Sequence, residues 1–113
     1  MRERALMLWL TTGLLASGMV AADKADKKAG DPEKGKAVFA QQCIMCHNAT
    51  TTEKKMGPGL KGVFKKDKLA NGKKATEQNI RAQLDNGGNG MPAYKDMLSE
   101  EERNDTIAYL KTL

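Results

Sequence analysis

The pattern of hydrophobic and polar positions along the chain predicts three helices. In each of the segments 32–42, 77–86 and 100–113, apolar residues gather on one face at helical spacing. They are Val38 and Phe39 in the first segment, Ile80 and Leu84 in the second, and Ile107, Tyr109 and Leu110 in the third. No stretch of useful length alternates between apolar and polar residues, as a half-buried strand would. We therefore expect an all-α fold with three main helices and some short helical turns.

Residues that commonly cap helices stand at the predicted helix ends. Asp31, Thr76 and Ser99 each precede a helical segment, and their side-chain oxygens can accept hydrogen bonds from its first N–H groups. Glu102 lies three positions after Ser99 and completes a capping box. The second segment ends at Gly87, and glycine is the usual left-handed stop. The caps and the apolar pattern give the same boundaries.

Gly35 lies inside the first predicted helix, where glycine costs about 1 kcal/mol relative to alanine. One reason to accept this cost is that another helix crosses closely at that point. The alternative is an ordinary surface glycine near a helix start.

The first 22 residues have the layout of a secretory signal peptide: a positive start, an uncharged leucine-rich run and small residues at its end. We expect cleavage after Ala22 and export of the chain. An uncleaved membrane anchor is the alternative, although the run is only just long enough, since a span takes about 20 residues. Residues 23–30 are charged and lack large apolar side chains, so we expect a disordered leader. Residues 31–113 then form one small domain.

The candidate chemistry lies in Cys43-Ile44-Met45-Cys46-His47. Two cysteines three positions apart, followed at once by a histidine, are typical of a c-type haem attachment site. We predict one haem bound covalently through Cys43 and Cys46, with its iron bound by His47, the only histidine of the chain. A thioredoxin-type disulfide is the main rival, but the βαβ pattern around such a motif is absent. A zinc site needs four ligands, and the motif supplies three.

A turn that follows the motif can orient the histidine. An axial histidine usually donates its second ring N–H to a carbonyl. Gly57-Pro58-Gly59 enforces a turn, and the Pro58 carbonyl is well placed in the sequence to accept that bond. We expect Leu60, together with Val63 and Phe64, to form a short helical segment in contact with the haem. A plain hydrophobic turn is the alternative.

With no second histidine in the chain, the second axial position is taken by a methionine or a lysine, or it is open. Met45 lies between the attaching cysteines, and Met56 lies beside the turn that should support His47. We favour Met91, which follows a glycine-rich loop with enough chain to reach the far face of the haem. Met97 is the next candidate, although we expect it to fill core space. A thioether ligand raises the reduction potential, and two protein ligands leave no position for a substrate at iron.

Four features in this order resemble a class I c-type cytochrome of the small bacterial, periplasmic type. They are the Cys-x-x-Cys-His motif, Gly57-Pro58-x-Leu60-x-Gly62, Met91-Pro92-Ala93-Tyr94, and a last helix that ends Tyr109-Leu110-Lys111. The resemblance covers residues 31–113 and implies a small cytochrome c fold wrapped around one haem c. It also implies that the first and last helices cross near Gly35, Phe39 and Tyr109. For the haem propionates we name Tyr94, Asn86 and Lys61 as candidate partners.

The function that follows is a soluble monohaem carrier of single electrons, not an enzyme, between periplasmic or membrane redox partners. A haem sensor or a peroxidase-like protein with a labile sixth ligand is the alternative, and a subunit of a larger enzyme is another. The formal net charge of +5 favours redox partners with acidic docking surfaces, and export argues against nucleic acid. Lysines such as Lys54, Lys55 and Lys61 would ring the haem edge, unless they serve solubility alone. We expect a monomer without stable membrane insertion after cleavage.

Overall fold

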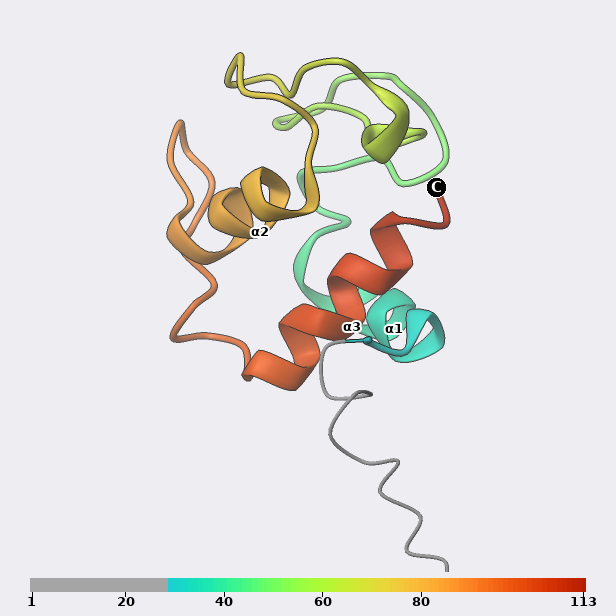
Figure 1. The fold of residues 1–113 in the computed structure, drawn as a ribbon, viewed down its shortest axis with the longest axis vertical. Coiled ribbons are helices and arrows are strands. Elements are labelled where there is room, and N and C mark those ends of the chain that lie inside the picture. Colours follow the sequence, from blue (N-terminus) through green and yellow to red (C-terminus); the bar gives the residue numbers. More distant parts are fainter. Residues whose placement is uncertain (1–28) are drawn as a thin grey trace, which may run out of the picture.

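The computed structural model describes residues 29–113, and within this range the chain forms three α-helices and one short 3-10 helix (Figure 1). They are α1 (Pro32–Gln42), η2 (Val63–Lys65), α2 (Glu77–Asn86) and α3 (Glu100–Leu110). These residues contain two isolated β-bridges but no β-strand. The predicted all-α fold with three main helices is confirmed. The predicted signal peptide lies outside the described residues.

The caps predicted from the sequence are present. The Asp31 carboxylate accepts a hydrogen bond from the Glu33 N–H at 2.9 Å, and Thr76 and Ser99 accept from residues three positions on, each at 3.1 Å. α2 ends at Asn86, and its C-cap residue Gly87 has a φ of 65°, the positive value that glycine tolerates. The boundaries of α1 and α2 are therefore the predicted ones.

The last helix is shorter than predicted, because α3 ends at Leu110 and not at Leu113. The Thr112 and Leu113 N–H groups bond three residues back, to Tyr109 and Leu110, which tightens the chain into a turn. The Thr112 hydroxyl also donates to the Tyr109 carbonyl, at 2.6 Å. Such local bonds compete with helix continuation.

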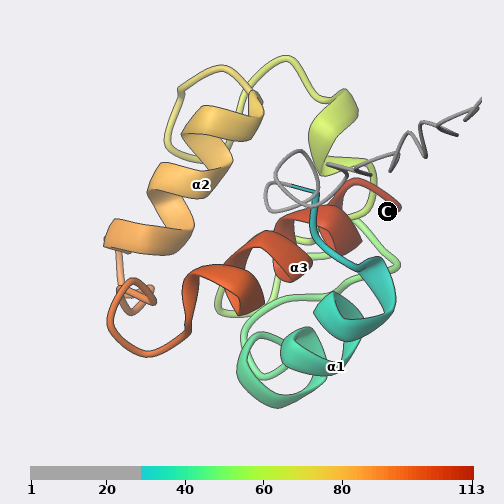
Figure 2. The same ribbon diagram turned by 60° about the horizontal axis from the view of Figure 1, so that its bottom comes forward.

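α1 and α3 cross closely at Gly35, and both views show them side by side (Figures 1 and 2). A Cβ atom added to Gly35 would overlap the carbonyl of Asp105, so no larger residue fits without movement of a helix. Next to this point the rings of Phe39 and Tyr109 pack with their centroids 5.5 Å apart and a tilt of 60°. Gly30, the last residue of the predicted leader, also lies against the α3 backbone. The predicted close crossing at Gly35 is confirmed.

A buried carboxylate fixes the same crossing. Asp105 is only 5% exposed, and its Oδ1 accepts a hydrogen bond from the Asp31 N–H at 2.7 Å. This bond joins the start of α1 to the middle of α3, 74 positions apart. On the other side of α3, Asp85 of α2 accepts from Arg103 at 2.7 Å and from Arg81 at 3.3 Å. Polar contacts thus hold both other helices to α3.

The apolar residues predicted to face inward are buried in the core or, like Val38 and Tyr109, partly buried against it, with one exception at Met97. The buried residues are Phe39, Cys43, Val63, Ile80, Leu84, Tyr94, Leu98, Ile107 and Leu110. Met97 is 58% exposed, so the prediction that it fills core space is wrong. Its neighbour Leu98 is buried in its place, in a turn where the N–H groups of both Met97 and Leu98 bond to the Tyr94 carbonyl.

Between residues 29 and 113, no helix has the length and apolar character that a membrane span needs.

Gly35→Ala should destabilise the folded protein by roughly 2 kcal/mol, because overpacking at the crossing outweighs the better helix propensity of alanine. The measurement is the free energy of unfolding of the haem-loaded protein in guanidinium chloride. Lys36→Ala, at an exposed position of the same helix, is the matched control and should change stability little. A Gly35→Ala variant as stable as the parent would show that the helices do not need this close approach.

Candidate haem-binding site

The end of α1 aims the Cys-x-x-Cys-His motif. Cys43 is the C-cap of α1, and its N–H bonds to the Phe39 carbonyl at 2.9 Å. The N–H groups of Cys46 and His47 both bond back to the Cys43 carbonyl, at 3.1 and 3.0 Å, and fold the motif into a turn. Cys43 is buried and Cys46 half-buried, and both are free thiols. The turn therefore holds the two sulfur atoms and the imidazole on one short piece of backbone.

Burial keeps the Cys43 thiol protonated. Desolvation, and then the charge of Cys46, raises the pKa of Cys43 from 9.0 to about 11. The Cys43 sulfur is therefore a neutral thiol in a largely apolar environment. Among residues 29–113, no three or more His, Cys, Asp or Glu side chains are grouped so that they could hold a metal ion.

The loop before Pro58 fixes the His47 ring. His47 Nδ1 lies 2.8 Å from the Pro58 carbonyl oxygen, the hydrogen bond that the sequence predicted. The Gly57 N–H donates to the Cys46 carbonyl at 2.8 Å, and the Lys55 ammonium donates to the Ile44 carbonyl at 3.0 Å. A carbonyl can only accept, so Nδ1 donates its N–H to it, and Nε2 is the ring nitrogen not used by this bond. The loop therefore selects the ring nitrogen that is left for a metal.

Gly57 contributes to this site in a way that the sequence did not reveal. A Cβ atom at this position would overlap the His47 ring. The sequence indicates only a turn at this glycine, because packing against a side chain ten positions earlier leaves no local pattern. The Gly-Pro-Gly run was the available signal.

The glycine-rich loop after α2 brings Met91 to the edge of the core. The N–H and carbonyl groups of Gly88 and Met91 pair in both directions, at 2.9 and 3.0 Å. Positive φ angles at Gly87, Gly88, Asn89 and Gly90 allow this tight path. Met91 is half-buried and packs against the core, and the Gln83 amide lies 3.7 Å from its sulfur. Gln83 directly precedes the buried Leu84 on α2, and no local sequence pattern indicates its contact with Met91.

The other methionines are more exposed than Met91. Met45 is 79%, Met56 81% and Met97 58% exposed. The Met56 sulfur lies 3.9 Å from that of Cys46, on the motif itself. Met91 is therefore the one methionine of residues 29–113 that packs against the core.

Tyr94 joins the two parts of the site. It is buried, its hydroxyl donates to the Gln42 carbonyl at 3.0 Å, and its N–H bonds to the Leu84 carbonyl at 3.0 Å. Gln42 directly precedes Cys43, and Tyr94 follows Met91 by three positions. Burial first, and then the nearby charges of Cys43 and Cys46, raises the pKa of the Tyr94 hydroxyl, so it remains a donor.

Comparison with known proteins identifies this arrangement. Residues 30–110 match the family model described as "Cytochrome C oxidase, cbb3-type, subunit III". The chain belongs to the class I c-type cytochromes. Proteins of this family carry covalently bound haem c with its iron, so the cytochrome is a haem protein.

Several cytochromes c6 are similar to this cytochrome. The protein named cytochrome c6 from Synechocystis sp. is 37% identical over 82 residues, which cover 73% of this chain and 65% of that protein. The match therefore spans just under two thirds of that relative's length. Cytochrome c6 from Bryopsis maxima is 36% identical over 85 residues, which cover 72% of this chain and 90% of that protein.

A solved structure has the same fold. Cytochrome c6 from the diatom Phaeodactylum tricornutum superposes with a TM-score of 0.58 at 32% sequence identity, covering 74% of this chain and 93% of that chain. The predicted small cytochrome c fold is thereby confirmed.

The donor set of the cytochrome fits a c-type haem. Two thiols in one turn, an imidazole with Nε2 left free and a half-buried thioether are the groups that a covalently attached, six-coordinate haem needs. Leu60 is half-buried against the core, and its N–H bonds to the Asn48 carbonyl at 2.8 Å. These residues remain candidate contacts of the haem.

The candidates for the propionates differ in their surroundings. Asn86 and Lys61 are exposed, and their predicted role stays a prediction. The Tyr94 hydroxyl hydrogen is already used by the Gln42 carbonyl, which leaves only its oxygen lone pairs.

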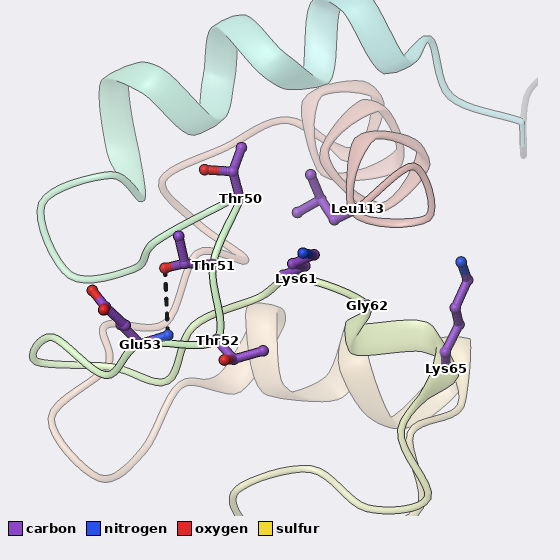
Figure 3. A pocket seen from close by; sticks show the side chains of 8 residues that line it. All are labelled: Thr50, Thr51, Thr52, Glu53, Lys61, Gly62, Lys65 and Leu113. Carbon is purple, nitrogen blue, oxygen red and sulfur yellow. Dashed lines mark hydrogen bonds between the residues drawn. The ribbon is translucent and has the colours of Figure 1, made fainter.

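A separate cavity of about 550 Å³ lies beside the last residue of the chain (Figure 3). It is lined by Thr50, Thr51, Thr52, Glu53, Lys61, Gly62, Lys65 and Leu113. None of Cys43, Cys46, His47 and Met91 lines it, whereas Lys61, a candidate partner of the propionates, does.

Tyr94→Phe should lower the stability of the haem-loaded cytochrome by about 1–2 kcal/mol, because the partly buried Gln42 carbonyl loses its partner. Guanidinium chloride unfolding measures the effect. Tyr109→Phe is the matched control, since the Tyr109 hydroxyl forms no hydrogen bond with a residue of the described part. Equal stability of the two variants would contradict a role for Tyr94 in joining the two parts of the site.

Proposed function

We propose that this cytochrome is a carrier of single electrons, not an enzyme, with one haem c attached through Cys43 and Cys46. When bound, the haem supplies reversible exchange of one electron between ferric and ferrous iron. The observation that carries the proposal is the 2.8 Å bond between His47 Nδ1 and the Pro58 carbonyl. This bond uses one ring nitrogen, presents the other as an axial ligand, and makes the imidazole more basic.

Met91 is the proposed second axial ligand. Its support is the packing of this one methionine against the core, at the end of a loop that Tyr94 joins to the cysteine motif. The Gln83 amide, 3.7 Å away, orients the thioether. Asn71 in turn donates to the Gln83 side-chain oxygen at 3.1 Å and holds the amide in place. A soft thioether favours ferrous iron and raises the reduction potential.

Two protein ligands give the carrier its function by leaving no position for a substrate at iron. The protein's own contribution is then to hold both axial side chains in one geometry for both oxidation states. Because the ligands keep the same positions in the ferric and ferrous states, electron exchange does not require them to move. A labile sixth ligand would instead indicate a sensor or a peroxidase-like protein.

The proposed exit for the electron is the surface around Cys46. The exposed apolar side chains of Ile44, Met45 and Met56 lie on or beside the attachment turn. Lys54 and Lys55 follow on the neighbouring loop. An apolar centre with a positive rim fits redox proteins that have acidic docking surfaces. We propose that the mature chain meets them as a monomer in the periplasm, after removal of residues 1–22.

Met91→Ala should abolish the weak red band that sulfur gives on ferric haem, and the ferrous variant should bind carbon monoxide, since the second face is open. The parent should keep the band and resist carbon monoxide at neutral pH. Met97→Ala, at an exposed methionine six positions away, is the matched control and should behave as the parent. If the band survives in Met91→Ala and disappears in Met97→Ala, the assignment of the ligand is wrong. Rapid carbon monoxide binding by the parent would contradict the carrier function.

Oxidation of the ferrous cytochrome by hexacyanoferrate, an anion, should slow by about tenfold as salt is added, because exposed charges are screened over about 10 Å at 0.1 M. Stopped-flow absorbance at several ionic strengths measures the rate constant. At low salt Lys54→Gln should lower the rate more than Lys34→Gln, which removes the same charge from α1. A rate that does not depend on salt would rule out electrostatic steering to this surface.

A further inference from the structure

The positive charge of the chain is concentrated in one segment. Residues 61–74 contain six lysines and one aspartate, a net of +5, and the formal net charge of the whole chain is also +5. The other residues are therefore balanced between acids and bases. Lysines that served solubility alone would not need to lie together in one segment. The lysines are Lys61, Lys65, Lys66, Lys68, Lys73 and Lys74.

The segment is a folded loop that displays these lysines. An isolated bridge pairs Lys68 with Lys74, and the Leu69 N–H bonds to the Lys73 carbonyl at 2.8 Å. Gly72, with a φ of 82°, makes the reversal, and half-buried Leu69 anchors the loop on the core. The loop is therefore held by its own backbone contacts and by Leu69.

None of the six lysines is neutralised within the described part of the chain. All six are exposed, and none forms an ion pair with a residue of 29–113. The Lys66 ammonium donates only to the Gly59 carbonyl, at 3.4 Å. Lys61 and Lys65 stand at the cavity beside Leu113, where Glu53 is the one acidic side chain of the lining (Figure 3). The loop thus presents an uncompensated positive surface.

Most of this surface lies away from the attachment turn, and Lys61, where the segment begins, is the exception: its N–H bonds to the Thr51 carbonyl at 3.3 Å. In both ribbon views the segment, drawn yellow-green to yellow, is at the end of the molecule opposite α1 (Figures 1 and 2). α1 ends at Gln42, and the cysteine motif begins at the next residue. A partner bound at residues 61–74 therefore leaves the surface around Cys46 free.

We propose that residues 61–74 are a docking surface for a bilayer that contains anionic lipid. A protein interface needs an apolar centre, but here the exposed side chains are charged, polar or small, and the larger Val63, Phe64 and Leu69 are buried or packed against the core. An anionic bilayer needs only the lysines, and each lysine near its surface strengthens binding about fivefold. The cytochrome would rest on the membrane surface by this loop, with the turn around Cys46 directed away from the lipid and open to redox partners. The inference does not depend on the axial ligands or on the direction of electron flow.

The test is binding of the exported, haem-loaded protein to vesicles, measured by co-sedimentation. Vesicles that mix phosphatidylglycerol with phosphatidylcholine are compared with vesicles of phosphatidylcholine alone, at several salt concentrations. The loop variant carries Lys65→Gln, Lys68→Gln and Lys73→Gln. The matched control carries Lys34→Gln, Lys36→Gln and Lys95→Gln, three exposed positions outside the loop with the same loss of charge.

We expect the parent and the control to bind the phosphatidylglycerol vesicles in low salt, and the loop variant to bind about 100-fold more weakly, from about fivefold for each lysine. Equal weakening in both variants would overturn the proposal, because binding would then follow total charge. So would equal binding of the parent to both kinds of vesicle, or no binding to either. If the vesicles do not distinguish the variants but exchange with an acidic redox protein slows only in the loop variant, the surface docks protein and the lipid proposal fails. None of these outcomes alters the spectrum that tests Met91.

Discussion

The close crossing of α1 and α3 at Gly35 is the contact on which the rest of the structure depends. Because Gly35 has no side chain, the two helices approach until the α3 backbone fills the space of a Cβ atom. The Asp31 N–H and the buried Asp105 carboxylate fix the crossing along its length. α1 then ends at Gln42, so the position of the whole attachment turn follows from where these helices meet.

Two short hydrogen bonds position the side chains of the candidate haem site relative to the crossed helices. The Pro58 carbonyl orients the His47 ring, and the Tyr94 hydroxyl ties the loop of Met91 to the residue before Cys43. Each contact joins segments that are separate in the sequence, by 11 positions in the first case and 52 in the second. Both use a backbone carbonyl as acceptor, so the geometry depends on how the chain runs more than on which side chains flank it.

The sequence predicted what local physics determines. Asp31, Thr76 and Ser99 gave the helix starts, since a cap acts within three residues. The end of α3 was missed because it depends on competing local bonds at Thr112 and Leu113, and the exposure of Met97 was missed because it depends on which neighbour the folded chain turns toward the core. The contacts of Gly57 with His47 and of Gln83 with Met91 were also missed, since only the folded chain brings these residues together. The roles of Cys43, Cys46 and Met91 toward haem stay predictions, supported by this geometry.

The central claim is that His47 and Met91 close both faces of the iron. X-ray absorption at the iron edge of the oxidised, haem-loaded protein tests it most directly, because it reports the ligand atoms without a variant. The account predicts five nitrogen neighbours, four from the porphyrin and one from His47, and one sulfur neighbour. Six nitrogen or oxygen neighbours without sulfur, or a five-coordinate iron, would contradict it.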